Sequence, residues 1–298
     1  MNEAIGIAGG AGSADGAALG WGGRLGARWA AHAEAMEAQL APLSDIALKV
    51  LATRPGERVM DLGAGQACTT LALADAVGPA GAVTALELSP DLAAMARARL
   101  ADRPWAAVLE GDAATQTLSP ASHDALFSRL GCMFFADPVP AFANLRAGLV
   151  PGGRVVLCAY TAREDNPWAG IPIEVAETVF GPKAAWPTGA EIGGPFAWAE
   201  DATVRAILTG AGFGDVAITP HDVSMPIGRG IAEDPVEAAI TLTATVGPVG
   251  RRIALEPEVD RPAAVAAYAE AMRPRLAPFV RDGAVHLGGR FWLIEARA

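Results

Sequence analysis

The sequence is poor in cysteine, in histidine and in charged side chains. Its 298 residues include 3 Cys and 4 His, and only 19% of them are Asp, Glu, Lys or Arg. Cys68, Cys132 and Cys158 are widely spaced and form no CxxC pair, so we expect reduced thiols, a cytoplasmic location and no zinc site. No apolar run reaches the roughly 20 residues of a membrane span. No basic segment precedes Arg24, which argues against a signal peptide.

Basic residues are also scarce relative to acidic ones. Lys and Arg number 23 against 33 Asp and Glu, for a formal net charge of −10. Proteins that bind a phosphate backbone concentrate Lys and Arg, so this balance argues against nucleic acid as the main partner. The hydrophobic share of 52% excludes a disordered, solvating chain. The composition therefore indicates an acidic globular protein.

From residue 55 onward, short runs of Val and Leu alternate with Ala-rich stretches of helical length. The expected strands are 58–62, 82–88, 106–110, 124–128 and 154–159, and the expected helices between them are 67–77, 90–101 and 138–149. Ser89-Pro90 and Asp137-Pro138 each place a capping side chain before a proline at the first helical position. This alternation predicts βαβ units and a parallel sheet, hence an α/β fold.

The chain beyond this regular region is less uniform. A helix at 201–211, a strand near 216–219 and a final strand at 290–296 are expected, and 162–199 is irregular with five prolines. The expected parts are a flexible N-terminus (1–23), an N-terminal helical lid (24–54), a main domain (55–222 plus 286–298) and two cap insertions over the active face (162–199 and the largely helical 225–285).

The sharpest motif is Asp61-Leu-Gly63-Ala-Gly65, between the first expected strand and its helix. Glycines there let the backbone turn tightly and approach a ligand. A carboxylate in such a loop repels a pyrophosphate and attracts an ammonium or sulfonium group, which favours a cationic nucleoside over a dinucleotide. The spacing also misses GxGxxG, because Cys68 stands at the third glycine position.

Two further acids follow the next two strands, Glu87 at the end of the second and Asp112 after the third. In doubly wound sheets, ligands bind at the carboxyl ends of the strands. We expect Glu87 to accept hydrogen bonds from ribose hydroxyls and Asp112 to accept one from an adenine amino group. Acids at three consecutive strand ends predict a nucleoside site, with a different Rossmann-like nucleotide site as the alternative.

These motifs, in this order, resemble the class I S-adenosylmethionine-dependent methyltransferases over roughly residues 58–213. The segments that carry the resemblance are Val-Met-Asp61-Leu-Gly63-Ala-Gly65, Leu86-Glu87-Leu88-Ser89, Gly111-Asp112-Ala113, Leu149-Val-Pro151-Gly152-Gly153 and Ala211-Gly212-Phe213. Residues 127–138 resemble a bacterial subgroup related to the ubiquinone and menaquinone methyltransferases. The resemblance implies a Rossmann-like, seven-stranded, mostly parallel sheet whose last strand is antiparallel, with helices on both faces.

The resemblance also implies S-adenosylmethionine as the cofactor and S-adenosylhomocysteine as its product. The methionine part would lie on the glycine loop, the ribose on Glu87 and the adenine on Asp112 and Ala113. The expected cofactor-binding residues are Asp61, Gly63, Ala64, Gly65, Glu87, Leu88, Asp112, Ala113 and Ser128. Ala67 stands where many members have a third glycine, which is harmless if the backbone there is helical.

The acceptor is expected to be a small, apolar or aromatic molecule. Both insertions and the N-terminal lid leave the same end of the sheet, and a roofed pocket suits a small molecule. The expected acceptor-binding residues are Trp29, Cys132, Met133 and Trp168. The roof aromatics Trp168, Phe180, Trp186, Phe196 and Trp198 either line the pocket or pack the cap internally.

Candidate catalytic residues are His32 and Arg129. We expect His32 on one helix face with Trp29, three residues earlier, where it could take a proton. Arg129 either binds an acidic acceptor or forms a structural ion pair. His123 is expected to be structural, while His221 and His286 lie on the rim or the surface.

Two other functions are compatible with the same motifs. One is an enzyme of the same fold that uses the sulfonium for chemistry other than methyl transfer, and the other is a cofactor-binding regulator or partner subunit without turnover. The nucleoside motifs are shared by oxygen, nitrogen, carbon and sulfur methylation. They therefore predict the cofactor and leave the acceptor atom and the oligomeric state open.

Overall fold

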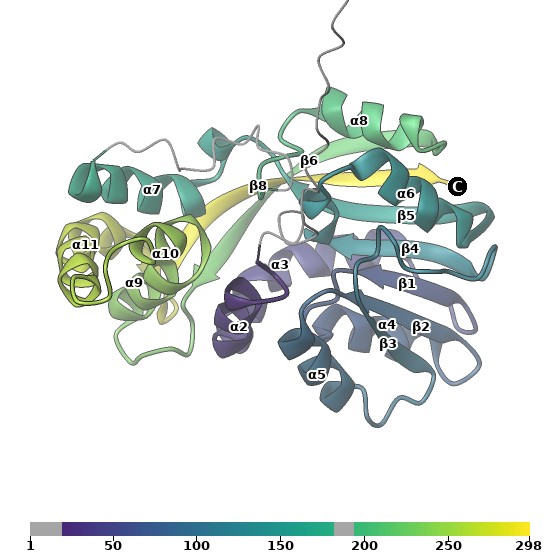
Figure 1. Ribbon diagram of the computed structural model, residues 1–298, viewed down its shortest axis with the longest axis horizontal. Helices are drawn as coiled ribbons and strands as arrows, with labels where there is room; N and C mark the ends of the chain where they lie inside the picture. Colours follow the sequence, from purple (N-terminus) through teal and green to yellow (C-terminus); the bar gives the residue numbers. More distant parts are fainter. Residues whose placement is uncertain (1–19, 182–193) are drawn as a thin grey trace, which may run out of the picture.

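A single twisted sheet runs through the protein, and it is built mainly from the Val- and Leu-rich segments (Figure 1). The computed structural model describes residues 20–181 and 194–298. The strands are β1 (Arg58–Leu62), β2 (Ala82–Glu87), β3 (Ala106–Glu110), β4 (His123–Arg129), β5 (Leu149–Tyr160), β6 (Gly214–Ile227), β7 (Val280–Arg281) and β8 (Ala284–Arg297).

The strand order is β3-β2-β1-β4-β5-β8-β6, and the two-residue β7 pairs with β8. Neighbours from β3 to β5 are parallel, whereas β8 runs antiparallel to both β5 and β6. The predicted mostly parallel sheet with an antiparallel last strand is confirmed. Register pairs such as Leu62 with Leu86 and Glu87 with Glu110 bring the carboxyl ends of β1, β2 and β3 to one edge.

Helices cover both faces of this sheet. They are α2 (Arg24–Ala31), α3 (Ala33–Leu51), α4 (Cys68–Val77), α5 (Pro90–Arg99), α6 (Pro138–Ala147), α7 (Pro167–Phe180), α8 (Asp201–Gly210), α9 (Pro235–Thr245), α10 (Gly247–Ile253) and α11 (Arg261–Leu276), with short 3₁₀ turns η1 (Gly131–Phe134), η2 (Arg163–Asp165) and η3 (Ala277–Phe279). In Figure 1, α6 and α8 lie in front of the sheet, and α3 and α4 lie behind it.

The N-termini of α5 and α6, both predicted to carry a capping side chain before a proline, differ in their capping hydrogen bonds. The Ser89 hydroxyl accepts a hydrogen bond from the Leu92 N–H at 3.4 Å and so caps α5. Asp137 stands at the N-cap of α6 but makes no side-chain capping bond, so only its position agrees with the prediction.

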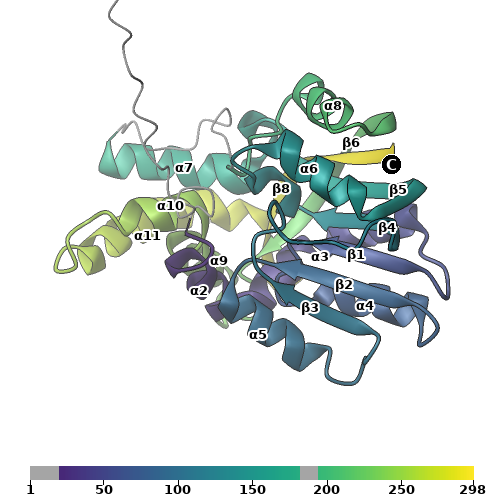
Figure 2. The same ribbon diagram turned by 45° about the vertical axis from the view of Figure 1, so that its right-hand side comes forward.

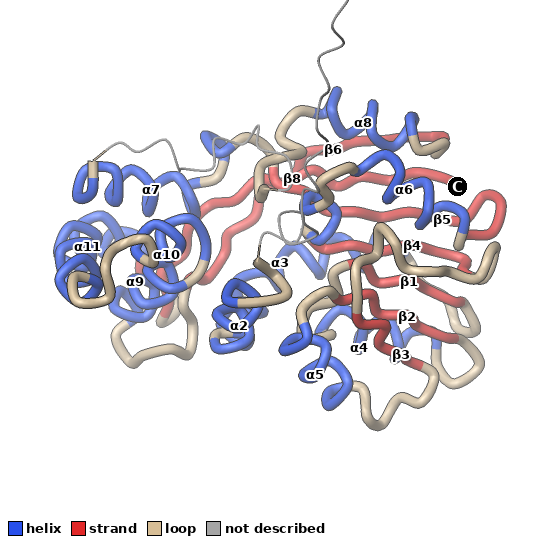
Figure 3. Tube along the Cα trace, in the orientation of Figure 1, coloured by secondary structure: helices blue, strands red, loops and turns tan. Residues whose placement is uncertain are grey.

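The last two long strands extend well past the parallel strands, which the sequence did not predict. β6 and β8 have 14 residues each, and α7, α9, α10 and α11 gather around their far ends (Figures 2 and 3). Residues 225–285 therefore contain strand as well as helix. Residues 162–199 contain α7, a 14-residue helix that starts at Pro167 and accommodates Pro172, so proline density alone was misleading.

Aromatic residues of the first insertion divide between the core and the cap. Phe196 and Trp198 are buried, and Trp198 packs against Phe142 with ring centroids 5.3 Å apart. Phe180 lies under the Arg252 guanidinium at 4.9 Å. Trp186 and residues 1–19 of the expected flexible N-terminus lie outside the described residues.

Three histidines belong to strands. His123 begins β4, at the end of the sheet opposite the glycine loop, and its imidazole bonds Thr84 and Ser122, each at 2.9 Å. Contrary to expectation, His221 lies within β6, stacked on Phe291, and His286 lies within β8. None of the described helices is long and apolar enough to cross a membrane.

Candidate functional site

A pocket of about 560 Å³ opens at the carboxyl edge of β1 to β4. One wall comes from the loops that follow these strands, and the other comes from α2, α3, α7 and α10. This volume falls in the range of small-molecule sites. Residues of 24–54, 162–199 and 225–285 thus line one cavity with the loops of the Rossmann-like strands.

The glycine loop forms the floor of the pocket, and its two glycines have different tasks. Gly63 and Gly65 have φ values of 69° and 59°, in the left-handed region that favours glycine. A Cβ on Gly63 would lie 2.8 Å from the Cα of Gly131, so this pair lets the β1 and β4 loops touch. A Cβ on Gly65 would meet no atom within 4 Å, which leaves its backbone open to a ligand.

Ala67, which stands where many members of the resembled family have a third glycine, does not have a helical backbone. Ala67 has φ 66° and ψ 31°, so the expectation of a helical backbone there is wrong. Ala67 is fully buried, and it packs with Ala96 and Leu100. An alanine in this conformation is strained by roughly 1–2 kcal/mol, and packing of its methyl group compensates.

Asp61 lies beneath the glycine loop and does not line the pocket. It is 1% exposed, and one carboxylate oxygen accepts hydrogen bonds from Thr69 at 2.9 Å and Thr70 at 2.7 Å. The other oxygen has no partner among the described residues, and burial raises the pKa of Asp61. Strand alternation therefore turns this acid toward α4, so it anchors the loop instead of contacting a ligand.

Glu87 joins two loops at the pocket surface. Its Oε2 accepts from the Gly65 N–H and its Oε1 accepts from the Ser89 N–H, both at 2.7 Å. The side chain lines the pocket, although the residue is only 5% exposed. Burial raises the pKa of Glu87, against the backbone N–H groups that stabilise its charged form.

Asp112 supplies a carboxylate near Glu87 at the strand ends of the pocket. It follows β3, and its Oδ1 accepts from the Ala114 N–H at 2.9 Å. Its neighbours Gly111 and Ala113 also line the pocket, as do Ala64 and Leu88 of the neighbouring loops. Ser128 does not, because its buried hydroxyl donates to the Leu62 carbonyl at 2.8 Å and ties β4 to β1.

Arg129 takes the structural alternative of the two that its position suggested. Its guanidinium donates to both carboxylate oxygens of Glu37, at 2.8 and 2.7 Å, and to the Ser44 hydroxyl at 2.7 Å. Burial of Glu37 favours its neutral form, but the hydrogen bonds and charge of Arg129 outweigh burial and hold the pKa of Glu37 below its usual value. Both side chains line the pocket as a neutralised pair.

His32 and Cys132 do not line the pocket. His32 has φ −121° and separates α2 from α3, so the expected continuous helix face with Trp29 is interrupted. Its imidazole is therefore not placed to take a proton from a molecule in this cavity. Cys132 is fully buried, its thiol donates to the Cys158 carbonyl at 3.2 Å, and burial raises the pKa of that thiol.

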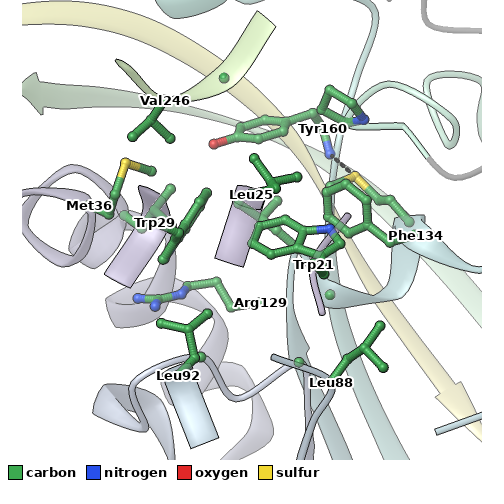
Figure 4. Close-up of a pocket in the computed structure, with 18 of the residues that line it drawn as sticks. Trp21, Leu25, Trp29, Met36, Leu88, Leu92, Arg129, Phe134, Tyr160 and Val246 are labelled. Atoms are coloured by element: carbon green, nitrogen blue, oxygen red, sulfur yellow. Dashed lines mark hydrogen bonds between the residues drawn. The ribbon is translucent and has the colours of Figure 1, made fainter. Parts of the chain in front are cut away.

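Aromatic rings form the upper wall of the pocket (Figure 4). Trp21 meets Trp29 edge-on at 5.3 Å and Phe134 at 5.4 Å, while Tyr160 packs on Trp168 at 4.8 Å. Of the acceptor-binding residues that the sequence suggested, Trp29, Met133 and Trp168 line the cavity.

Sequence reasoning missed Trp21, Phe134 and Tyr160. Trp21 follows a Gly-rich stretch without apolar periodicity, and Tyr160 ends a strand that reads as core, so neither gave a local signal. The aromatic residues of this wall come together only in the tertiary fold. Residues 20–181 and 194–298 hold no group of three His, Cys, Asp or Glu side chains suited to a metal ion.

Comparison with known proteins places the glycine loop and both carboxylates inside one matching segment. The methyltransferase domain family matches residues 60–157. A 37.1 kDa protein of transposon TN4556 from Streptomyces fradiae is 37% identical over 112 residues, which cover 38% of this chain and 32% of that protein. A demethylmenaquinone methyltransferase from Lysinibacillus sphaericus is 27% identical over 120 residues, 40% of this chain and 51% of that protein.

These matches span about a third and about a half of the length of the two curated relatives. Among solved structures, a candidate methyltransferase from Bacillus halodurans superposes with a TM-score of 0.52 at 17% identity, covering 85% of this chain and 97% of that one. At this identity the likeness concerns the fold.

Proposed function

We propose that the chain transfers a methyl group from S-adenosylmethionine to a small, apolar or aromatic acceptor, because residues 60–157 match the methyltransferase domain family and 120 residues resemble a demethylmenaquinone methyltransferase. One observation carries this proposal. A single pocket joins an open glycine loop and two carboxylates at one end to an aromatic wall at the other.

The carboxylate end fits the nucleoside of this cofactor. Glu87 is placed to accept from ribose hydroxyls and Asp112 from an adenine amino group, while Gly65 leaves room for the methionine part. The loop also departs from the GxGxxG spacing of dinucleotide sites, because Cys68 stands at the third glycine position. S-adenosylmethionine supplies a methyl group bound to a positively charged sulfur, and the negative charges of Glu87 and Asp112 favour binding of that cation.

The aromatic end fits the acceptor. Methyl transfer is a displacement that depends on in-line placement, and a closed apolar wall supplies orientation and excludes water. Trp21, Trp29 and Phe134 lie where they can do this, between α2 and the β4 loop. The Arg129–Glu37 pair closes α3 against β4, so its role here is to hold the pocket together.

The same reasoning assigns tasks to the segments outside the matched domain. We propose that residues 24–54 are a lid, since α2 and α3 both contribute to the pocket wall. The helices of 162–199 and 225–285 would act as a cap, since Trp168 of α7 and Val249 of α10 line the acceptor end.

Calorimetric titration of the purified protein with S-adenosylhomocysteine tests the cofactor, with NAD as the comparison ligand. Micromolar binding of the former and none of the latter supports the proposal. Binding of NAD alone would contradict it. Incubation with S-adenosylmethionine and an acceptor panel then tests transfer, because a methylated product separates methyl transfer from other sulfonium chemistry and from binding without turnover.

A further inference from the structure

Tyr160 presents an unpartnered hydroxyl to the aromatic end of the pocket. It is the last residue of β5, it is 4% exposed, and its backbone N–H donates to the Met133 sulfur at 3.3 Å. Its phenol oxygen has no hydrogen-bond partner in the part of the chain that the structure describes. Figure 4 shows this oxygen directed toward the apolar side chains of Trp29, Met36 and Val246.

The second tyrosine provides a contrast, since the chain has only two. Tyr268 is also fully buried, but its hydroxyl lies 3.0 Å from the Thr243 hydroxyl and is satisfied within the protein. Buried polar groups are normally paired, because an unpaired one loses its bonds to water without compensation. The Tyr160 phenol oxygen instead borders the open space of the pocket, so its hydrogen-bond partner comes from outside the chain, as water or as a ligand.

We propose that the Tyr160 hydroxyl binds an oxygen substituent of a planar, uncharged acceptor. This inference rests on the proposed function and adds the residue that selects and orients the acceptor. A phenol both donates and accepts hydrogen bonds, so it suits a hydroxyl or carbonyl oxygen. Trp29 and Trp168 both line this pocket, and aromatic side chains favour a flat molecule.

The Arg129–Glu37 pair offers no net charge to a ligand at this hydroxyl. Arg129 and Glu37, the charged pair that lines this part of the pocket, neutralise each other through two hydrogen bonds. Burial raises the pKa of Tyr160, although the Arg129 charge acts in the opposite direction. The phenol is therefore neutral at physiological pH, so it orients an oxygen without removing its proton.

A pair of probes that differ by one hydroxyl tests this assignment. The protein saturated with S-adenosylhomocysteine is titrated with 1-naphthol and with naphthalene, and the ratio of the two affinities is the measured quantity. We expect Tyr160→Phe to lower the naphthol preference about 3- to 10-fold, the size of one neutral hydrogen bond. Tyr268→Phe is the matched control and should leave the ratio unchanged.

Phenylalanine keeps the ring that packs on Trp168, so Tyr160→Phe should fold and should bind S-adenosylhomocysteine like the unmodified protein. A spectroscopic readout is independent of affinity. With ¹³Cζ-labelled tyrosine the protein has two such resonances, and 1-naphthol should shift the one that Tyr160→Phe removes.

Three results would overturn the inference. They are an unchanged affinity ratio in Tyr160→Phe, a naphthol-induced shift of the Tyr268 resonance alone, and the absence of binding by either probe to the S-adenosylhomocysteine complex. If S-adenosylhomocysteine itself does not bind, the proposed function fails at its first step. Titration of the cofactor product alone therefore distinguishes the two failures.

Discussion

At the scale of single residues, Glu87 connects the β1 loop, the β2 loop and the pocket through one carboxylate. It holds the Gly65 and Ser89 N–H groups and still faces the cavity. Replacing it with alanine should weaken S-adenosylhomocysteine binding by about 1–3 kcal/mol, the scale of lost hydrogen bonds to a charged group. Calorimetric titration measures the change directly.

Glu110 offers a matched control for this substitution. It pairs with Glu87 in register on the adjacent strand, but it forms a surface ion pair with Arg97 and does not line the pocket. Glu110→Ala should leave the affinity unchanged. Equal affinities of Glu87→Ala and the unmodified protein would remove the ribose assignment.

Arg129 makes a different prediction, because its partner is a buried acid. Truncation to alanine leaves Glu37, whose side chain is 20% exposed, without its countercharge. We expect the free energy of unfolding to fall by about 3–5 kcal/mol, as for other broken buried pairs. Where the variant is fully folded, its affinity for S-adenosylhomocysteine should change little. Urea unfolding of the ligand-free variant measures the loss in the free energy of unfolding.

The double variant Glu37→Leu, Arg129→Met provides the control, since it removes both charges and keeps apolar volume. It should be more stable than Arg129→Ala. If both variants lose the same stability, the loss comes from packing and the ion pair is not its cause.

The same pair predicts a pH dependence. The pKa of Glu37 in the folded protein is below its ordinary value of 4.5, so its contribution to stability is complete above that value and disappears as the pH falls through the lowered pKa. The free energy of unfolding of the unmodified protein minus that of the double variant should be constant above about pH 5 and decrease below it. A difference that grows on acidification would contradict the proposed ionisation of Glu37.

At the scale of secondary-structure elements, α2 closes the pocket by resting on the start of α5. Gly26 makes this approach possible, because a Cβ there would overlap the Ser89 side chain and the Trp21 carbonyl oxygen. Gly26→Ala should displace α2 and weaken S-adenosylhomocysteine binding about 5-fold or more, since overpacking typically costs 1–3 kcal/mol. Stopped-flow dissociation should show the loss as a faster off-rate.

Gly22→Ala is the control for this element, because an added Cβ there meets no heavy atom within 4 Å. It should bind like the unmodified protein. Unchanged binding in Gly26→Ala would mean that α2 does not help to retain the cofactor product.

At the scale of the whole molecule, the pocket is built from segments that are distant in sequence. The wall includes Trp21 before α2, the β1 to β4 loops, and Val249 of α10. A ligand in this pocket should therefore stabilise the protein as a unit. At a hundred times its dissociation constant, S-adenosylhomocysteine should add about 2.7 kcal/mol to the unfolding free energy. Thermal unfolding should shift upward by roughly 5 °C, and NAD should have no such effect.

Hydrogen exchange can locate this stabilisation. Protection on binding S-adenosylhomocysteine should reach α2 as well as the glycine loop, because both border the same cavity. Protection confined to the loops after β1, β2 and β3 would contradict a shared, closed pocket.

Local sequence patterns were enough to predict the parallel core of the fold and the strand-end residues at the Glu87 and Asp112 side of the pocket. Both depend on local rules: strand and helix periodicity, glycines in a tight turn, and acids placed directly after consecutive parallel strands. Glu87, Asp112, Gly63 and Gly65 accordingly lie where the sequence placed them. Such rules act within a few residues, so they can be read from a linear chain.

Which side chains pair and which face the cavity depends on tertiary packing. Asp61 lies under its loop, and Arg129 pairs with Glu37, 92 residues earlier in the chain. His32 lies at the break between two helices. Tyr160 became part of the acceptor wall because β5 ends beside α7 and η1. These outcomes depend on the packing of distant elements, and packing is settled by shape and burial across the whole fold, which no local pattern encodes.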